Sequence, residues 1–189
     1  MTDDIDLFIF YLRRHLEVLD AEIADISSKI DTSDDPEGNG YYDSGEYFMG
    51  AGLAAVHKYM TETFYSFGVD QKKALDAGPK LAGGVSFANV VWFAANYWKH
   101  DAEWWKGAIE VGSKDSDGMS PINILWPAGG KPKSSVALLE GVGRFGHDYI
   151  CSIVLATLVD DAEDVRLRSV LTYLESWRTD VKQMAVSKL

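Results

Sequence analysis

A strict 3.5-residue repeat of large aliphatic side chains runs through the first thirty residues. Its members step alternately by four and three positions: Ile5, Ile9, Leu12, Leu16, Leu19, Ile23, Ile26 and Ile30. This spacing puts every member on one side of an α-helix, and such a narrow seam is typical of a helix packed along another helix. Thr2 or Asp3 can cap the helix, with further aspartates near its positive end. Phe8 and Tyr11 widen the apolar side, which favours more than one neighbouring helix.

A second helix is predicted from about Asp43 to Phe67, after an acidic loop at 31–40 that contains a proline and two glycines. Its apolar stripe has the same alternating steps: Met49, Leu53, Val56, Met60, Thr63 and Phe67. The short connection favours an antiparallel hairpin of these two helices. His57 is expected to be a structural or surface histidine at the edge of that stripe.

The stretch from Ser86 to Trp105 holds four of the six tryptophans and predicts a central helix. Ser86 is a suitable N-cap. Apolar residues then recur at helical spacing: Phe87, Val90, Val91, Ala94, Tyr97 and Trp98. A helix that is apolar on nearly all sides is expected inside a bundle.

The remaining elements follow from the same signals. A short helix is expected within 69–77, and residues 112–133, with four glycines and three prolines, are expected to be irregular apart from a possible short strand at 122–125. Ser134 and Ser135 open another helix that runs to about Val154, and Asp160 and Asp161 are expected to cap a final helix. The apolar stripe of that last helix is Val170, Leu171, Leu174, Trp177, Val181 and Met184.

The sequence therefore predicts an all-α fold, a helical bundle of five or six helices with one long irregular loop, formed as a single α-helical domain over residues 1–189. The expected core comprises Leu12, Leu16, Leu19, Leu53, Val56, Val91, Phe93 or Trp92, Ile153, Leu171 and Leu174.

Charge and composition narrow the classes of function. The formal net charge of −11 repels nucleic-acid phosphate, so a broad nucleic-acid binder is not expected. Cys151, the single cysteine, is expected to be a buried small hydrophobe, and a chain without a possible internal disulfide fits a reducing compartment. The acidic N-terminus differs from a signal peptide, and no apolar run is long enough to span a membrane. A cytoplasmic protein is predicted.

The common catalytic and metal-binding signatures are missing from the sequence. There is no Glu-x-x-His, Cys-x-x-Cys, His-Glu-x-x-His or Gly-x-Ser-x-Gly, and no phosphate-binding glycine loop. The Asp115–Gly118 segment departs from a calcium loop, because Ser113 and Ile124 stand where ligands are needed. No metal and no cofactor are expected.

One motif on the central helix, Ala95-Asn96-Tyr97-Trp98-Lys99-His100, resembles the HEPN family of small all-α bundles. The resemblance covers these six residues and their helical context. It implies a ribonuclease of a toxin–antitoxin or anti-phage system, in which an arginine and a histidine from two protomers meet. Asn96 and His100 match the polar residue and the histidine of the motif, whereas Ala95 replaces its arginine.

Arg144 and His147 lie three apart on the next long predicted helix. If that helix packs on the central one, Arg144 would stand near His100 and supply in space the arginine that the motif lacks. Residues around His100 also form a possible binding rim of aromatics and both charges: Trp98, Lys99, Asp101, Glu103, Trp104 and Trp105. The structural alternative is that Asn96 and His100 satisfy the end of a buried helix.

Two functional hypotheses follow. In the first, the chain is a non-catalytic α-helical interaction protein, such as an antitoxin, immunity or phage-defence component with an acidic binding face and a protein partner. In the second, it is a non-standard HEPN-like RNase that uses His100 with an arginine supplied in space. A homodimer is expected from the long seam of the first helix and from the tryptophan cluster.

Overall fold

The computed structural model describes residues 6–81, 84–112, 149–159 and 165–187, and for residues 101–112 it describes the backbone. Within these ranges the chain forms six α-helices and one 3₁₀ helix. They are α1 (Leu7–Thr32), α2 (Tyr41–Ser66), α3 (Gln71–Asp76), α4 (Phe87–Gly112), α7 (Ile150–Leu158), η2 (Leu167–Val170) and α8 (Leu171–Val186). The described residues contain no strand beyond one isolated bridge, between Lys80 and Ser86, so the all-α prediction is confirmed.

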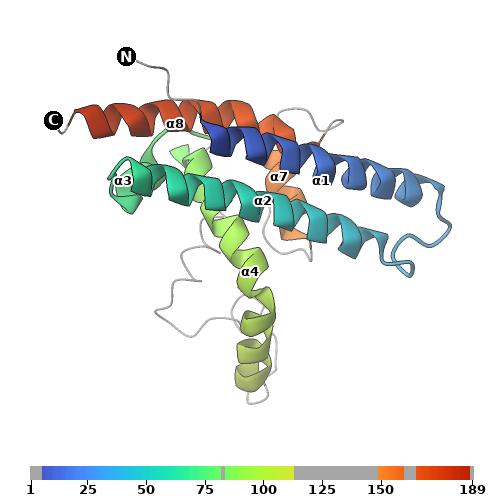
Figure 1. Ribbon diagram of the computed structural model, residues 1–189. Coiled ribbons are helices and arrows are strands. Elements are labelled where there is room, and N and C mark those ends of the chain that lie inside the picture. The colour runs from blue at the N-terminus through green and yellow to red at the C-terminus, as the bar shows by residue number, and fades with distance from the viewer. Residues whose placement is uncertain (1–5, 82–83, 113–148, 160–164, 188–189) are drawn as a thin grey trace.

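Helices α1 and α2 run antiparallel, side by side, as the short connection predicts (Figure 1). The seam of α1 faces the interior: its middle members are buried, and Ile9 and Ile30 at the two ends are half-buried. Ile5 lies outside the described residues. The buried members are Leu12, Leu16, Leu19, Ile23 and Ile26. The predicted core positions of α2, Leu53 and Val56, are buried as well.

The start of α1 differs from the expectation in two respects. The N-cap is Asp6 and not Thr2 or Asp3, because the Asp6 carboxylate accepts a hydrogen bond from the Ile9 amide at 3.0 Å. Phe8 and Tyr11 do not widen the buried side. Both side chains are largely exposed to solvent, at 66% and 63%.

Helix α4 crosses α2, and its second half extends beyond the hairpin (Figure 1). Ser86 caps it as predicted: the Asn89 amide donates to Ser86 Oγ at 3.2 Å, and Ser86 Oγ donates to the Leu75 carbonyl. The first half of α4 is central to the core, with six buried side chains: Phe87, Ala88, Val90, Val91, Ala94 and Ala95. Trp92 and Phe93, one of which was expected in the core, are half-buried.

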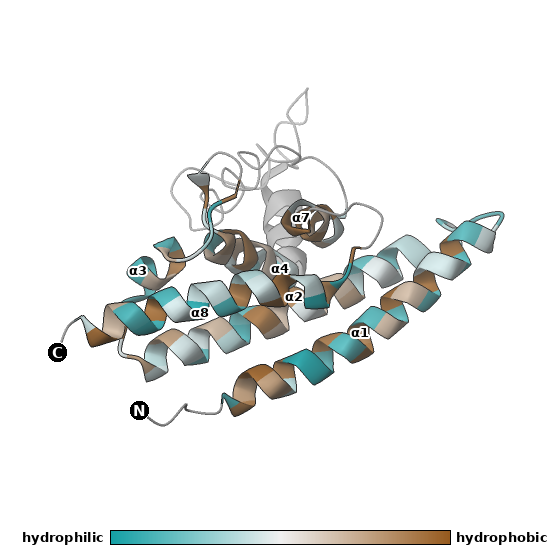
Figure 2. Cartoon of the chain, turned by 90° about the horizontal axis from the view of Figure 1, so that it is seen from above, coloured by the Kyte–Doolittle hydropathy of each residue, from teal (hydrophilic) through white to brown (hydrophobic). Residues whose placement is uncertain are grey.

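The C-terminal elements complete the core. The predicted stripe of α8 is buried except at Met184, which is half-buried, and Trp177 Nε1 donates to the Ala74 carbonyl of α3 at 2.7 Å. Cys151 is buried as predicted, whereas Ile153 is half-buried because it lies on the outer side of α7. Figure 2 shows hydrophobic residues gathered on α7 and, separately, on the first turns of α1.

Two predicted boundaries were wrong. Tyr149 is non-helical and precedes the first residue of α7, so the helix expected from Ser134 to Val154 is not continuous through that point. The last helix, α8, has Val170 as its N-cap residue and follows the 3₁₀ turn η2, whereas the predicted caps Asp160 and Asp161 lie outside the described residues. The expected loop at 112–133 and the possible strand at 122–125 lie, from residue 113 onward, outside the described residues.

Candidate functional site

The residues proposed from the motif lie along α4. Asn96, Trp98, Lys99 and His100 are described with their side chains, and Asn96 and His100 are both half-buried, one turn apart. Asp101, Glu103, Trp104 and Trp105 belong to the helical backbone of α4, but their side chains lie outside the described part of the chain. Arg144 and His147, predicted to stand near His100, also lie outside the described residues.

Trp98 has a packing role where α4 crosses α2. A Cβ atom added at Gly50 of α2 would lie 2.0 Å from Trp98 Cδ1, so only glycine leaves room for the indole there. The Trp98 ring also meets Tyr47, with ring centroids 5.6 Å apart. Trp98 therefore holds α2 and α4 together, and its predicted place in a binding rim stays a prediction.

His57 of α2 lies in the same crossing and packs against Trp92, with ring centroids 4.1 Å apart and the ring planes tilted by 42°. Within the described part of the chain its Nε2 atom is buried without a hydrogen-bond partner. Burial, and secondarily the charge of Lys99, lower the pKa of His57 to about 4. Partial desolvation also lowers the pKa of Lys99. His57 is thus neutral at pH 7 and serves packing, as the sequence suggested.

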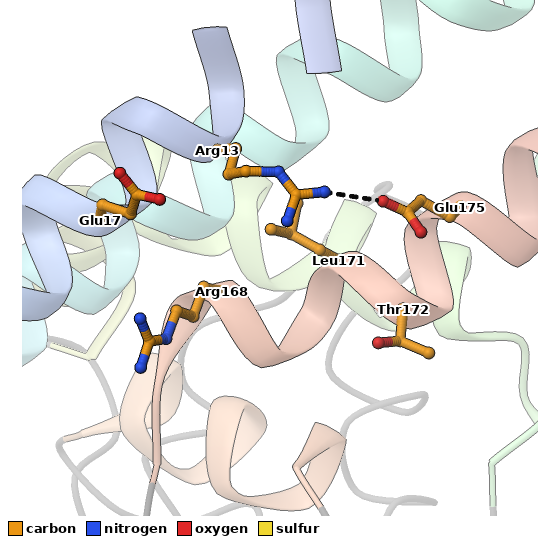
Figure 3. Close-up of a pocket in the computed structure, with 6 residues that line it drawn as sticks. All are labelled: Arg13, Glu17, Arg168, Leu171, Thr172 and Glu175. Atoms are coloured by element: carbon orange, nitrogen blue, oxygen red, sulfur yellow. Dashed lines mark hydrogen bonds and ion pairs between the residues drawn. The ribbon is translucent and has the colours of Figure 1, made fainter. Parts of the chain in front are cut away.

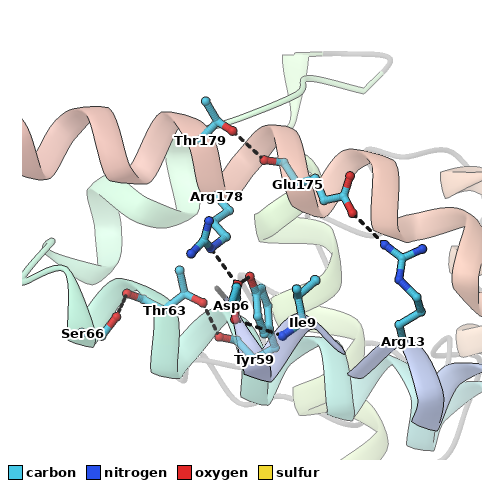
Figure 4. Close-up of polar contacts among 9 residues, drawn as sticks. All are labelled: Asp6, Ile9, Arg13, Tyr59, Thr63, Ser66, Glu175, Arg178 and Thr179. Carbon is cyan, nitrogen blue, oxygen red and sulfur yellow. Dashed lines mark hydrogen bonds and ion pairs between the residues drawn. The ribbon is translucent and has the colours of Figure 1, made fainter. Parts of the chain in front are cut away.

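Two arginines bind carboxylates where α1 meets α8. Arg13 of α1 pairs with Glu175 of α8 at 3.0 Å, and Arg178 of α8 pairs with Asp6 at 2.8 Å. Figure 4 shows how these pairs tie the start of α1 to α8. Tyr59 of α2 joins them by donating its hydroxyl to Asp6 at 2.5 Å. Burial, followed by the Asp6 carboxylate, raises the pKa of Tyr59.

A surface pocket of about 240 Å³ lies between α1 and the η2–α8 segment. It is lined by Arg13, Glu17, Arg168, Leu171, Thr172 and Glu175. Figure 3 shows that Arg13 reaches across to Glu175, whereas Arg168 points away from that pair. Two cations and two carboxylates leave the pocket without a dominant charge, so it selects neither an anion nor a cation.

Two further carboxylates cap the N-termini of other helices across long sequence distances. Glu46 of α2 accepts from the Cys151 amide at 2.5 Å and from the Ser152 amide at 2.9 Å, which fixes the start of α7. Asp20 of α1 accepts from the Leu167 amide at 2.7 Å and fixes η2. Helix N-termini carry unsatisfied amides and partial positive charge, so a carboxylate there is stabilising. These residues serve the fold.

The most unusual surface is the outward side of the first turns of α1. Five large apolar side chains project there and are between 55% and 66% exposed. We call this set the α1 outer face: Leu7, Phe8, Phe10, Tyr11 and Val18. At 100° per residue, Leu7, Phe10, Tyr11 and Val18 point away from the buried seam, whereas Phe8 lies beside it. Figure 2 shows the hydrophobic start of α1.

Other kinds of site find no support in the described ranges. No group of three or more His, Cys, Asp or Glu side chains in those ranges could hold a metal ion. None of the described helices combines the length and apolar composition of a membrane span. Comparisons with protein-family models, curated proteins and solved structures found no match for this chain.

Proposed function

We propose that this chain is a non-catalytic α-helical interaction protein of the cytoplasm, which associates with protein through the α1 outer face. The observation that carries the proposal is the exposure of five large apolar side chains over three turns of one helix. A cluster of large exposed apolar side chains on one helix is uncommon on soluble monomers and marks sites of association. Tyrosine and phenylalanine, which form most of this face, are also enriched at interfaces.

The homodimer expected from the seam of α1 needs a different surface. The seam residues are already buried within the chain against α2 and η2, so they are not available to a second copy. The side chains of the α1 outer face, in contrast, are more than half exposed within the part of the chain that the structure describes. We therefore propose that self-association uses the outward side of the same helix.

Charge supports a role as an antitoxin, immunity or phage-defence component with an acidic face. The far end of the α1–α2 hairpin carries acidic residues, and the chain as a whole has a net charge of −11. They include Asp31, Asp34, Asp35 and Glu37. Such a field favours approach of a basic protein and disfavours nucleic acid.

A second candidate function is the HEPN-like RNase with His100. It is favoured by the partial exposure of Asn96 and His100, one turn apart on α4. In that role His100 would act as a general base or acid on the RNA 2′-hydroxyl, for which an imidazole is suited. The phosphate would still need an arginine, and Arg13 and Arg178 are paired with carboxylates on α1 and α8.

Sedimentation velocity and an RNA assay test the proposal. Wild-type protein should show a concentration-dependent shift towards dimer over about 5–200 µM, the range of weak interfaces. The Leu7→Glu/Tyr11→Glu variant should stay monomeric, while Val186→Glu, at an exposed apolar position of α8, should behave as wild type. A monomeric wild type, or a double variant that still dimerises, contradicts the proposal.

In the RNA assay, the purified protein should release no more product than the His100→Ala variant. Cleavage that is lost in His100→Ala, with an unchanged melting temperature, would establish the RNase and refute the non-catalytic function.

A further inference from the structure

Four residues of α1 form one outward stripe: Leu7, Tyr11, Arg14 and Val18. They step by four, three and four positions, and at 100° per residue they fall within an arc of about 60°. The stripe is about 16 Å long and lies roughly 140° from the centre of the buried seam. Phe8 and Phe10 flank it on either side. It is thus a short contact surface for one further helix.

The sequence of steps along this stripe is the same in both directions. Read from either end, the stripe has an aliphatic residue at each end, Leu7 or Val18, and Tyr11 and Arg14 at its two inner positions. Arg14 stands in the middle of an otherwise apolar face and is largely exposed. Its ion pair within the chain is weak, since Arg14 Nη1 lies 3.9 Å from Glu17 Oε2.

We propose, on the basis of the function proposed above, that the occupant of the α1 outer face is α1 of a second copy in antiparallel register. The two-fold axis passes between Tyr11 and Arg14. Leu7 then meets Val18 of the partner subunit, and Arg14 lies on the ring of the partner's Tyr11. A guanidinium over a tyrosine ring is a favourable cation–π contact. A parallel pair would instead bring the two Arg14 side chains together, which is repulsive.

The charge of the chain favours a second copy over a membrane surface as the occupant of the α1 outer face. Anionic lipid would be repelled by the net charge of −11, and insertion into any lipid would bury Arg14 in the centre of the face. Two copies of an acidic chain also repel each other, but ionic screening weakens this repulsion beyond about 8 Å at physiological salt. Self-association should therefore strengthen with added salt, whereas binding of a basic partner would weaken.

Disulfide trapping tests the register. Leu7→Cys and Val18→Cys are made as separate single variants, in a chain whose only native cysteine is buried. Each variant is checked for an unchanged melting temperature and for dimerisation by sedimentation. Mild oxidation of the mixture should give a covalent dimer containing one chain of each variant. Each variant alone, and the wild type, should give at least about tenfold less covalent dimer. In the antiparallel pair, a residue does not face the same residue of the partner subunit, so two identical cysteines cannot be bridged.

A covalent dimer formed by Leu7→Cys alone would show a parallel pair and overturn the register. Dimers seen in sedimentation, sensitive to Leu7→Glu/Tyr11→Glu but not trapped in the mixture, would also overturn it and leave the proposed function intact. Failure of the wild type to self-associate at any salt concentration would overturn both.

Discussion

Asp6 connects three elements through one carboxylate. It caps α1 at the Ile9 amide, accepts from Tyr59 of α2, and pairs with Arg178 of α8. Its side chain is 13% exposed, so these contacts are little screened by water. Arg178 also lies over the Phe67 ring, 5.7 Å from its centroid. The start of α1 is therefore fixed by a residue that local sequence rules would treat as one of several equivalent aspartates.

Asp6→Ala should lower the free energy of unfolding by about 2–4 kcal/mol. It removes the cap and leaves a buried hydroxyl and a half-buried guanidinium without their acceptor. Asp6→Asn keeps a capping oxygen and should cost about 1–2 kcal/mol. Urea denaturation measures both, with Asp34→Ala in the exposed loop as a near-neutral control. Equal costs for Asp6→Ala and Asp34→Ala would show that the carboxylate network does not stabilise the fold.

His57 gives the fold a dependence on pH. Its pKa in the folded state is about 4, below the ordinary value of 6.5, so between those values the unfolded chain binds the proton more readily. Stability is then complete above about pH 6.5 and falls as the pH drops towards 4. Because the ring is partly exposed, we expect a loss of about 1–2 kcal/mol between pH 7 and pH 5.

His57→Gln should remove that loss, and His15→Gln, at an exposed histidine of α1, should retain it. The measurement is the midpoint of urea denaturation at each pH. A pH dependence in His57→Gln equal to that of the wild type would assign the effect to other groups.

Among the elements, α2 depends on two glycines for its close packing. Gly50 receives Trp98 of α4, and Gly52 receives Leu167 of η2, where an added Cβ would lie 2.4 Å from a Leu167 methyl carbon. Alanine is normally better than glycine inside a helix by about 1 kcal/mol. At Gly50 alanine should instead be less stable than glycine, because the added methyl overlaps the Trp98 indole that packs between the two helices.

Gly50→Ala should therefore destabilise the protein by about 1–3 kcal/mol. Gly45→Ala in the same helix should be neutral or stabilising, since its added Cβ would meet Ile26 Cγ2 at 3.8 Å, an ordinary contact. In a Trp98→Leu background the cost of Gly50→Ala should largely disappear. A stabilising Gly50→Ala in the wild-type background would mean that Trp98 does not occupy this position.

The elements also show what sequence periodicity can and cannot predict. The seam of α1, the stripe of α8 and the Ser86 cap depend on residues within a few turns of one another, and all three were predicted. Glu46 and Asp20 cap segments more than a hundred residues away, and no local spacing signals such a contact. Helix geometry does predict the outward position of Tyr11, because this residue lies about 110° around the helix from the centre of the seam.

The candidate site was less predictable than the fold. Trp98 and His57 are aromatic side chains on helices, a pattern shared by binding rims and by tight helix crossings. Only the geometry showed that Gly50 receives the Trp98 ring and that His57 packs against Trp92. The role of His100 stays a prediction, since its possible partners Arg144 and His147 lie outside the described residues.

For the whole molecule, one helix serves two purposes. The inward side of α1 is buried against the chain, and its outward side exposes a largely apolar face around Arg14. An interior seam requires burial for stability, whereas an exposed face of this kind adds nothing to the folded monomer and gains from association. The central claim is that the outward side is covered by protein in solution.

Hydroxyl-radical footprinting with mass spectrometry tests this claim on the unmodified chain. Wild-type protein is labelled at about 1 µM and at about 200 µM, below and above the range expected for a weak interface. Phe8, Phe10 and Tyr11 should lose most of their labelling at the higher concentration, while Tyr65 of α2, which is similarly exposed, should keep it. Equal labelling of the α1 residues at both concentrations would contradict the claim.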